Sequence, residues 1–201
     1  MSNAPTADAV KQLREKTGVG IMECKHALKE SKGNFEKAIE ILRKKGIAVA
    51  QKKSGRATKE GRITSYIHMG GKIGVLVEIG CETDFVAKTD DFKEFSQNIA
   101  MHIAAAHPQY LSPDNVPQDF IDKEKEIFKA QIKDKPPHIV DKIIQGKVNK
   151  RLEEICLLEQ PYVKDDKMKV KDYLTSIIAR IGENIVIRRF ARYELGEDIK
   201  K

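Results

Sequence analysis

The sequence contains no tryptophan, and aromatic residues make up only 6% of its 201 residues. Few rings are therefore available to stack on nucleotide bases. The three cysteines, Cys24, Cys81 and Cys156, lie far apart and form no C-x-x-C pair. This spacing argues against a zinc site and against a disulfide framework.

The sequence also lacks long apolar runs. No run approaches the roughly 18 consecutive apolar residues that a membrane-spanning helix needs. The first ten residues have neither a basic leader followed by an apolar stretch nor the character of an organelle presequence. We therefore expect a protein of the cytoplasm, without a membrane partner.

Sequence signatures of catalysis are missing as well. There is no nucleophile elbow, no phosphate-binding G-x-x-x-x-G-K and no H-E-x-x-H. His102 and His107 with Asp84 suggest acid–base chemistry, but His102 falls beside the apolar face of its helix, which favours a hydrogen-bonded packing histidine. Gly18 and Gly20 resemble half of a dinucleotide fingerprint, yet no strand precedes them. We expect no enzyme, no catalytic or metal-ligating residues, no cofactor and no small-molecule substrate.

Charge is the first feature that is present. The 37 basic and 30 acidic residues give a net charge of +7, which raises the chance of an acidic or nucleic-acid partner. Basic residues gather in the segment 48–60, which loses apolar periodicity and is typical of a linker or a frayed helix. A nucleic-acid patch is the alternative interpretation, and specific nucleic-acid binding is disfavoured because no aromatic residue is interleaved.

Residues 1–47 show three short apolar stripes at helical spacing, which predict a three-helix bundle. Turns are expected at 17–20 and 32–34, and Gly46 is expected to end the third helix. The stripes consist of Val10 and Leu13, then Met22, Ala27 and Leu28, then Phe35, Ala38, Ile39 and Leu42.

After Gly61 the apolar period changes from helical to alternating. The pattern predicts a β-hairpin that turns at Gly70–Gly71 and buries one face. That face is expected to contain Ile63, Ser65 and Ile67 on the first strand, and Ile73, Val75, Val77 and Ile79 on the second.

Helical patterns fill most of the remaining sequence. Thr89 is the expected N-cap of a helix that ends near Ala106. Further helices are predicted around Ile127, from Pro137 and from Val170 to Gly182, followed by a strand over 185–195. Strands early and late with helices between them predict an α+β core domain over 61–201, in which helices pack on a small antiparallel three-stranded sheet.

The segment Cys81–Lys88 joins the hairpin to this first core helix. It sets a carboxylate, Asp84, beside a large ring, Phe85. One interpretation is structural: Phe85 covers the core and Asp84 caps the helix. The other is a protruding wedge, in which the ring enters a crevice of a partner and the acid disturbs a charge or a metal there.

Four separated motifs resemble the bacterial translation elongation factor Ts family. They are Leu13–Lys25, Thr83–Lys88, Ile99–Ala105, and Ile181–Ile185 with Arg188 and Arg189. The resemblance covers nearly the whole chain. The chain is similar to the shorter form of the family, with one copy of the core unit where longer members have two similar subdomains and a helical hairpin insertion.

The resemblance implies a guanine nucleotide exchange factor that binds elongation factor Tu, promotes release of GDP and disturbs its magnesium site, so that GTP can rebind. The N-terminal bundle is expected to be similar to ubiquitin-associated domains and to dock on the nucleotide-binding domain of the partner. Asp84 and Phe85 are expected to insert between partner helices near the magnesium, and His102 to support contact near the phosphate-binding region. The implied contact residues are Lys11, Arg14, Ile21, Met22, Thr83, Asp84, Phe85, Val86, Ala87, Lys88 and His102.

A homodimer is expected to supply the contacts that a second subdomain makes in longer members. Two rival functions stay open at this point. A basic RNA- or ribosome-binding protein explains the net charge of +7. A plain interaction module binds a partner through the bundle and leaves nucleotide release unaltered.

Overall fold

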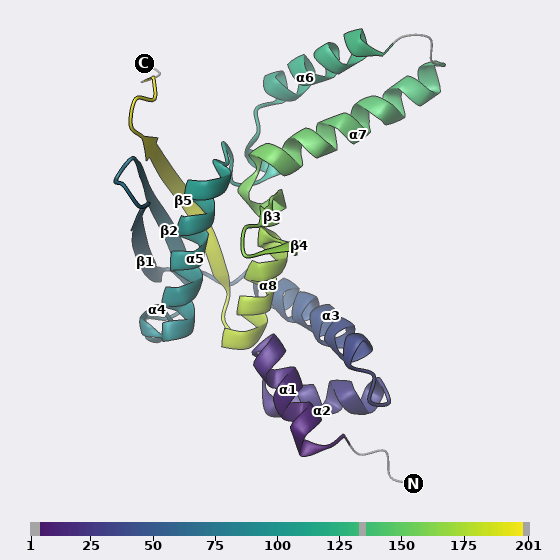
Figure 1. The fold of residues 1–201 in the computed structure, drawn as a ribbon, viewed down its shortest axis with the longest axis vertical. Coiled ribbons are helices and arrows are strands. Elements are labelled where there is room, and N and C mark those ends of the chain that lie inside the picture. The colour runs from purple at the N-terminus through teal and green to yellow at the C-terminus, as the bar shows by residue number, and fades with distance from the viewer. Residues whose placement is uncertain (1–4, 133–135, 199–201) are drawn as a thin grey trace. The chain divides into compact units, whose positions relative to one another are not determined.

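The computed structural model describes residues 5–132 and 136–198. It contains helices and strands in an α+β arrangement, as predicted (Figure 1). The α-helices are α1 (Ala7–Thr17), α2 (Ile21–Glu30), α3 (Phe35–Lys53), α4 (Asp84–Lys88), α5 (Asp90–Ala106), α6 (Gln118–Gln131), α7 (Pro137–Ile155) and α8 (Val170–Ile181). The strands are β1 (Glu60–Ile67), β2 (Ile73–Cys81), β3 (Pro161–Tyr162), β4 (Asp165–Lys169) and β5 (Ile185–Glu194), and single turns of 3-10 helix lie at Pro113–Asn115 and Leu157–Glu159.

The chain forms two compact units, each assembled from three segments. The first unit contains Met1–Arg62, Ile79–Phe95 and Tyr173–Val186. The second contains Ile63–Glu78, Ser96–Asp172 and Ile187–Lys201. The first unit therefore joins the N-terminal helices to α4 and α8, which the predicted boundaries at 47 and 60 assign to different domains.

The predicted three-helix bundle is present in the first unit. The side chain of Thr6 accepts a hydrogen bond from the Ala9 N–H and caps α1, and Asn34 caps α3 in the same way. Met22 is 59% exposed, so its predicted place in the apolar stripe is wrong. The buried core of the bundle consists of Val10, Leu13, Cys24, Ala27, Leu28, Ala38 and Leu42.

Two glycines of this unit fit closely against α8. Gly18 ends α1 in the left-handed region at φ 68°, and a Cβ there would lie 2.8 Å from the Arg180 Cδ. Gly46 does not end α3 as predicted, because the helix continues to Lys53. A Cβ at Gly46 would lie 3.3 Å from the Ala179 Cβ, so the missing side chain serves close packing.

The predicted hairpin of β1 and β2 is present, and β5 completes a three-stranded sheet in the order β1-β2-β5. Val75 and Val77 of β2 are buried as expected. The predicted buried face of β1 is wrong: Thr64 is buried, whereas Ile63 and Ile67 are 64% and 65% exposed. Alternation fixes which residues share a face but does not decide which face the core covers.

Helix α5 begins as predicted. The Thr89 hydroxyl accepts a hydrogen bond from the Phe92 N–H, and Asp90 and Asp91 occupy the first turn. Phe92 and Phe95 are fully buried, as are Ile99 and Ile103 one and two turns later. This apolar stripe is the buried face of α5.

The second unit contains an antiparallel pair of helices, α6 and α7 (Figure 1). Pro137 is the first residue of α7, in the position predicted for it. Both helices were predicted from the sequence, but their pairing was not. The pattern also did not predict the two-stranded β3–β4 hairpin, in which Tyr162 pairs with Asp165.

Candidate partner-binding site

Helix α4 displays Phe85 to solvent. The ring is 81% exposed, and no residue of the five-residue helix is buried. The interpretation in which Phe85 covers the core is therefore wrong. Thr83, and not Asp84, is the N-cap of α4, because its hydroxyl accepts a hydrogen bond from the Val86 N–H at 3.4 Å. A large exposed ring on an ordered segment is typical of an interaction site.

Asp84 lies beside the ring and pairs with the last residue of α4. Its Oδ2 accepts a hydrogen bond from the Lys88 Nζ at 2.6 Å. This hydrogen bond and the charge of Lys88 hold the pKa of Asp84 below its usual range and raise the pKa of Lys88. Helix α4 therefore carries an ionised carboxylate, that of Asp84, beside Phe85 at neutral pH. Exposed ion pairs of this kind are weak, so the carboxylate can exchange partners.

Glu183, which lies between α8 and β5, approaches α4 from a distant part of the sequence. Its Oε2 accepts hydrogen bonds from the backbone N–H groups of Glu82 at 3.1 Å and Thr83 at 3.0 Å. Its Oε1 accepts a hydrogen bond from the Thr83 hydroxyl at 2.7 Å. Three donors from the two residues that precede α4 thus bind one carboxylate. We call Asp84 and Phe85 of α4 the wedge.

A second carboxylate makes the reciprocal connection. Glu82 Oε1 accepts a hydrogen bond from the Asn184 N–H at 2.6 Å, and Oε2 lies 3.3 Å from the Arg56 Nη1. The backbone hydrogen bond from Asn184 is the largest cause that lowers the pKa of Glu82. We call Glu82, Thr83, Glu183 and Asn184 the clasp. All four residues lie within motifs of the sequence, but no role was predicted for Glu82, Glu183 or Asn184. Only the fold shows that these residues contact one another.

The N-terminal bundle presents a second surface. The implied contact residues Lys11 and Arg14 are exposed on α1. Ile21 and Met22 begin α2 and are 53% and 59% exposed. Exposed apolar and cationic side chains on one bundle are suited to a partner surface that combines an apolar hollow with acidic groups.

His102 is placed differently from the other implied contact residues, because its side chain is fully buried. Its Nε2 lies 3.0 Å from the Gln160 Oε1, and its Nδ1 accepts a hydrogen bond from the Val163 N–H at 3.2 Å. Gln160 also donates to the backbone oxygens of Ala106 and Glu154. We call His102 and Gln160 the hub. Burial lowers the pKa of His102, and the neutral ring with its proton on Nε2 satisfies every contact.

The buried histidine fits the packing interpretation from the sequence. A direct contact between the His102 ring and a partner would need exposed surface, which the ring does not have. Any support that it gives to binding therefore passes through the residues that it holds, among them Val163 at the turn between β3 and β4.

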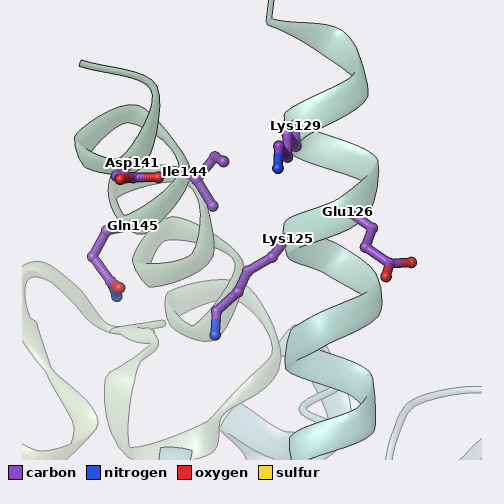
Figure 2. Close-up of a pocket in the computed structure, with 6 residues that line it drawn as sticks. All are labelled: Lys125, Glu126, Lys129, Asp141, Ile144 and Gln145. Carbon is purple, nitrogen blue, oxygen red and sulfur yellow. The ribbon is translucent and has the colours of Figure 1, made fainter. Parts of the chain in front are cut away.

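A hollow of about 320 Å³ lies between α6 and α7. Figure 2 shows Lys125 and Ile144 directed into the space between the helices and Glu126 directed away from it. Its lining mixes both signs of charge and includes none of the implied contact residues. Within the described part of the chain, no group of three or more His, Cys, Asp or Glu side chains is placed to hold a metal ion.

The three cysteines are buried free thiols. Burial raises the pKa of Cys81 and of Cys156 to about 11, so both thiols are protonated at neutral pH. In residues 5–132 and 136–198, no helix is both long and apolar enough to cross a membrane.

Comparison with known proteins gives consistent matches over nearly the whole chain. The family described as Elongation factor TS matches residues 8–177. Elongation factor Ts of Thermotoga neapolitana is 57% identical over 191 residues, which cover 95% of this chain and 97% of that protein. Elongation factor Ts of Syntrophus aciditrophicus is 54% identical over 98% of both chains. Elongation factor Ts of Carboxydothermus hydrogenoformans is 58% identical, over 98% of this chain and 91% of the relative.

Proposed function

The chain belongs to the elongation factor Ts family and is a translation elongation factor, and on this premise we propose that it binds elongation factor Tu and promotes release of GDP so that GTP can rebind. The observation that carries the proposal is the exposed ring of Phe85 on α4. An isolated apolar ring at the tip of an ordered segment is suited to enter a crevice of a partner.

The proposed mechanism is reciprocal weakening of two ligands. A GTPase holds its nucleotide through phosphate and magnesium contacts. If Phe85 fits only the partner conformation with a loosened nucleotide site, its binding must weaken nucleotide binding by the same coupling free energy. A buried aromatic anchor contributes about 2 kcal/mol or more, which is over tenfold in affinity. No covalent step is needed, so the chain is an exchange factor and not an enzyme.

Asp84 adds an electrostatic contribution to this mechanism. The wedge brings an ionised carboxylate toward a site that already holds anionic phosphates and a magnesium ion. A like charge that approaches the phosphates raises their free energy, and a carboxylate near the magnesium competes for it. The exposed pair with Lys88 keeps Asp84 ionised and holds it at the surface of α4.

The residues around the ring have supporting roles in the proposal. Thr83 caps α4, and Val86 and Ala87 are half-buried. Lys88 orients Asp84. His102 acts at a distance from the interface, by fixing the β3–β4 turn through Val163.

The N-terminal bundle, residues 1–47, is proposed to dock on the nucleotide-binding domain of elongation factor Tu. Ile21 and Met22 provide the apolar contact, and Lys11 and Arg14 provide complementary charge. Docking through a separate surface raises the effective concentration of the wedge at its target. The bundle therefore sets affinity, whereas the wedge sets the rate of release.

A homodimer is the second part of the proposal, and it concerns the outer face of the β1–β2 hairpin. Ile63, Ile67, Met69 and Leu76 are all exposed there, and the Ile67 Cδ1 lies 3.2 Å from where a Cβ on Gly74 would be. A group of exposed apolar side chains on one hairpin is suited to pack against a second copy. Ile67→Lys should shift the sedimenting species to half the mass, and an unchanged mass would contradict this interface.

The proposed site of action is the cytoplasm, where translation elongation takes place. The rival RNA-binding function predicts a binding affinity that falls steeply with salt. The exchange function predicts tight binding to one protein with little preference for RNA. Filter binding of labelled RNA at two salt concentrations separates these outcomes.

The direct experiment is release of labelled GDP from purified elongation factor Tu, with and without this chain. The proposal predicts faster release, a loss of more than tenfold in this acceleration with Phe85→Ala, and a smaller loss with Asp84→Ala. Glu153→Ala, which removes an exposed ion pair with Lys169, is the matched control. No acceleration by the native chain would refute the proposal.

A further inference from the structure

We infer that Glu183 is a positioning residue that holds the wedge in its binding-competent form, an inference that rests on the proposed exchange function. Glu183 lies about a hundred residues from α4 in the sequence and does not belong to the implied contact set. Its carboxylate is nevertheless the acceptor for three hydrogen bonds from the two residues that lead into α4.

Few other interactions hold α4 in place. A helix of five residues is too short to be stable alone, because nucleation costs more than one turn of hydrogen bonds returns. No residue of α4 is buried and only Val86 and Ala87 are half-buried, so apolar packing holds the helix weakly. The order of α4 must therefore come from its ends.

Glu183 controls the N-terminal end of α4. The Thr83 hydroxyl donates to the Glu183 Oε1 at 2.7 Å and accepts from the Val86 N–H at 3.4 Å. The carboxylate thus orients the hydroxyl hydrogen away from α4 and leaves the oxygen lone pairs for the cap. The two backbone N–H groups held by Oε2 fix the direction in which the chain enters the helix.

Asn184 connects the clasp to the residues that follow α3. Asn184 donates its backbone N–H to Glu82 and its side-chain amide to the backbone oxygens of Ser54 and Arg56. Lys53, the last residue of α3, donates to the backbone oxygen of Gly182. The same short segment, 182–184, therefore connects the end of α3 to the residues that lead into α4.

The consequence is preorganisation. When the clasp is intact, Phe85 meets a partner in one orientation, and little conformational entropy remains to be lost on binding. Without Glu183, α4 frays while the buried core stays in place, since none of the α4 side chains contributes to that core. Only a fraction of the molecules then has the wedge in its productive geometry, and the apparent activity falls in proportion to that fraction.

The first test replaces Glu183 by alanine and measures accelerated GDP release. We expect a loss on the order of tenfold for Glu183→Ala, because several hydrogen bonds to one carboxylate are removed together. Glu183→Gln should retain more activity, since one amide oxygen still accepts from the two backbone N–H groups. Glu153→Ala is again the control. Activity of Glu183→Ala equal to that of the native chain would overturn the inference.

The second test is a double-mutant cycle with Phe85→Ala. If Glu183 acts through the ring, Glu183→Ala should have no further effect on the residual activity of Phe85→Ala. An additional loss of the full size in that background would overturn the inference, because Glu183 would then act independently of the wedge.

The third test reads the order of α4 in the free protein and does not depend on exchange activity. Hydrogen exchange of the Thr83 and Val86 amides should be faster in Glu183→Ala, with protection of the buried part of α5 unchanged. Unchanged protection at Val86 would overturn the inference even if the native chain failed to release GDP. Should Glu183→Ala not fold, Thr83→Val and its control Thr83→Ser provide the same comparison, because only serine keeps the hydroxyl.

Discussion

The clasp and the hub are two polar networks that hold short segments in place, and they differ in exposure. His102 and Gln160 of the hub are 0% and 3% exposed. Three of the four clasp residues are accessible, because Thr83 is exposed and Glu82 and Glu183 are half-buried; Asn184 is the one buried member. Loss of one partner from a buried network lowers the stability strongly, because the remaining polar groups cannot form hydrogen bonds to water instead. A half-exposed network is replaced by water at smaller cost.

This difference predicts a division of roles between the two networks. The hub stabilises the second unit, and its loss should appear in the free energy of unfolding. The clasp orders a segment without buried residues, and its loss should appear in partner binding and in local hydrogen exchange. Each of the following changes tests that division.

The largest expected effect on stability comes from Gln160→Leu. The change leaves the His102 ring and the backbone oxygens of Ala106 and Glu154 without their hydrogen-bond partner. We expect a loss of about 3 kcal/mol in the free energy of unfolding, measured by urea denaturation. GDP release per folded molecule should change little. A stability equal to that of the native chain would show that the hub is not a stabilising network.

The next effect is a dependence of stability on pH. Burial lowers the pKa of His102 from its ordinary value of 6.5, so the unfolded state binds a proton that the folded state resists. Stability should therefore fall as the pH falls below 6.5, by at most about 1.4 kcal/mol per pH unit.

The matched variant is His102→Gln, which keeps a polar side chain but does not titrate. Its free energy of unfolding should depend less steeply on pH between 6.5 and 5 than that of the native chain. Equal slopes for the two proteins would assign the pH dependence to other groups.

The smallest effect is expected from Lys88→Ala. Its ion pair with Asp84 is exposed on both sides, so we expect no measurable change in the urea midpoint. The pKa of Asp84 should rise toward its ordinary value, because the hydrogen bond from Lys88 is the largest cause that lowers it. A marked loss in the free energy of unfolding would contradict the expectation that this exposed pair contributes little to stability.

The sequence predicted those features that periodicity and caps determine locally. The three helices of the bundle, the β1–β2 hairpin and the Thr89 cap of α5 are confirmed. It failed where a distant segment decides the outcome. Gly46 looked like a helix end because glycine commonly ends helices, but Ala179 of α8 needs the space. Ile63 and Ile67 looked like core residues because alternation alone does not tell the inner face from the outer.

The candidate site was predictable in composition but not in geometry. The pairing of Asp84 with Phe85 allowed both a core cap and a wedge, and only the 81% exposure of the ring decides against the core cap. His102 was equally ambiguous, and its complete burial follows from contacts with Gln160 and Val163, which lie about sixty residues away. Interactions at such separation leave no periodic signal in the sequence.

The central claim is that Phe85 loosens the nucleotide while the bundle provides affinity. It is tested most directly by the rate of GDP release from elongation factor Tu as a function of the concentration of this chain. The account predicts that Phe85→Ala lowers the maximal rate by more than tenfold. Met22→Asp, on the bundle surface, should instead raise the half-saturating concentration and leave the maximal rate unchanged. A native maximal rate with Phe85→Ala would contradict the account.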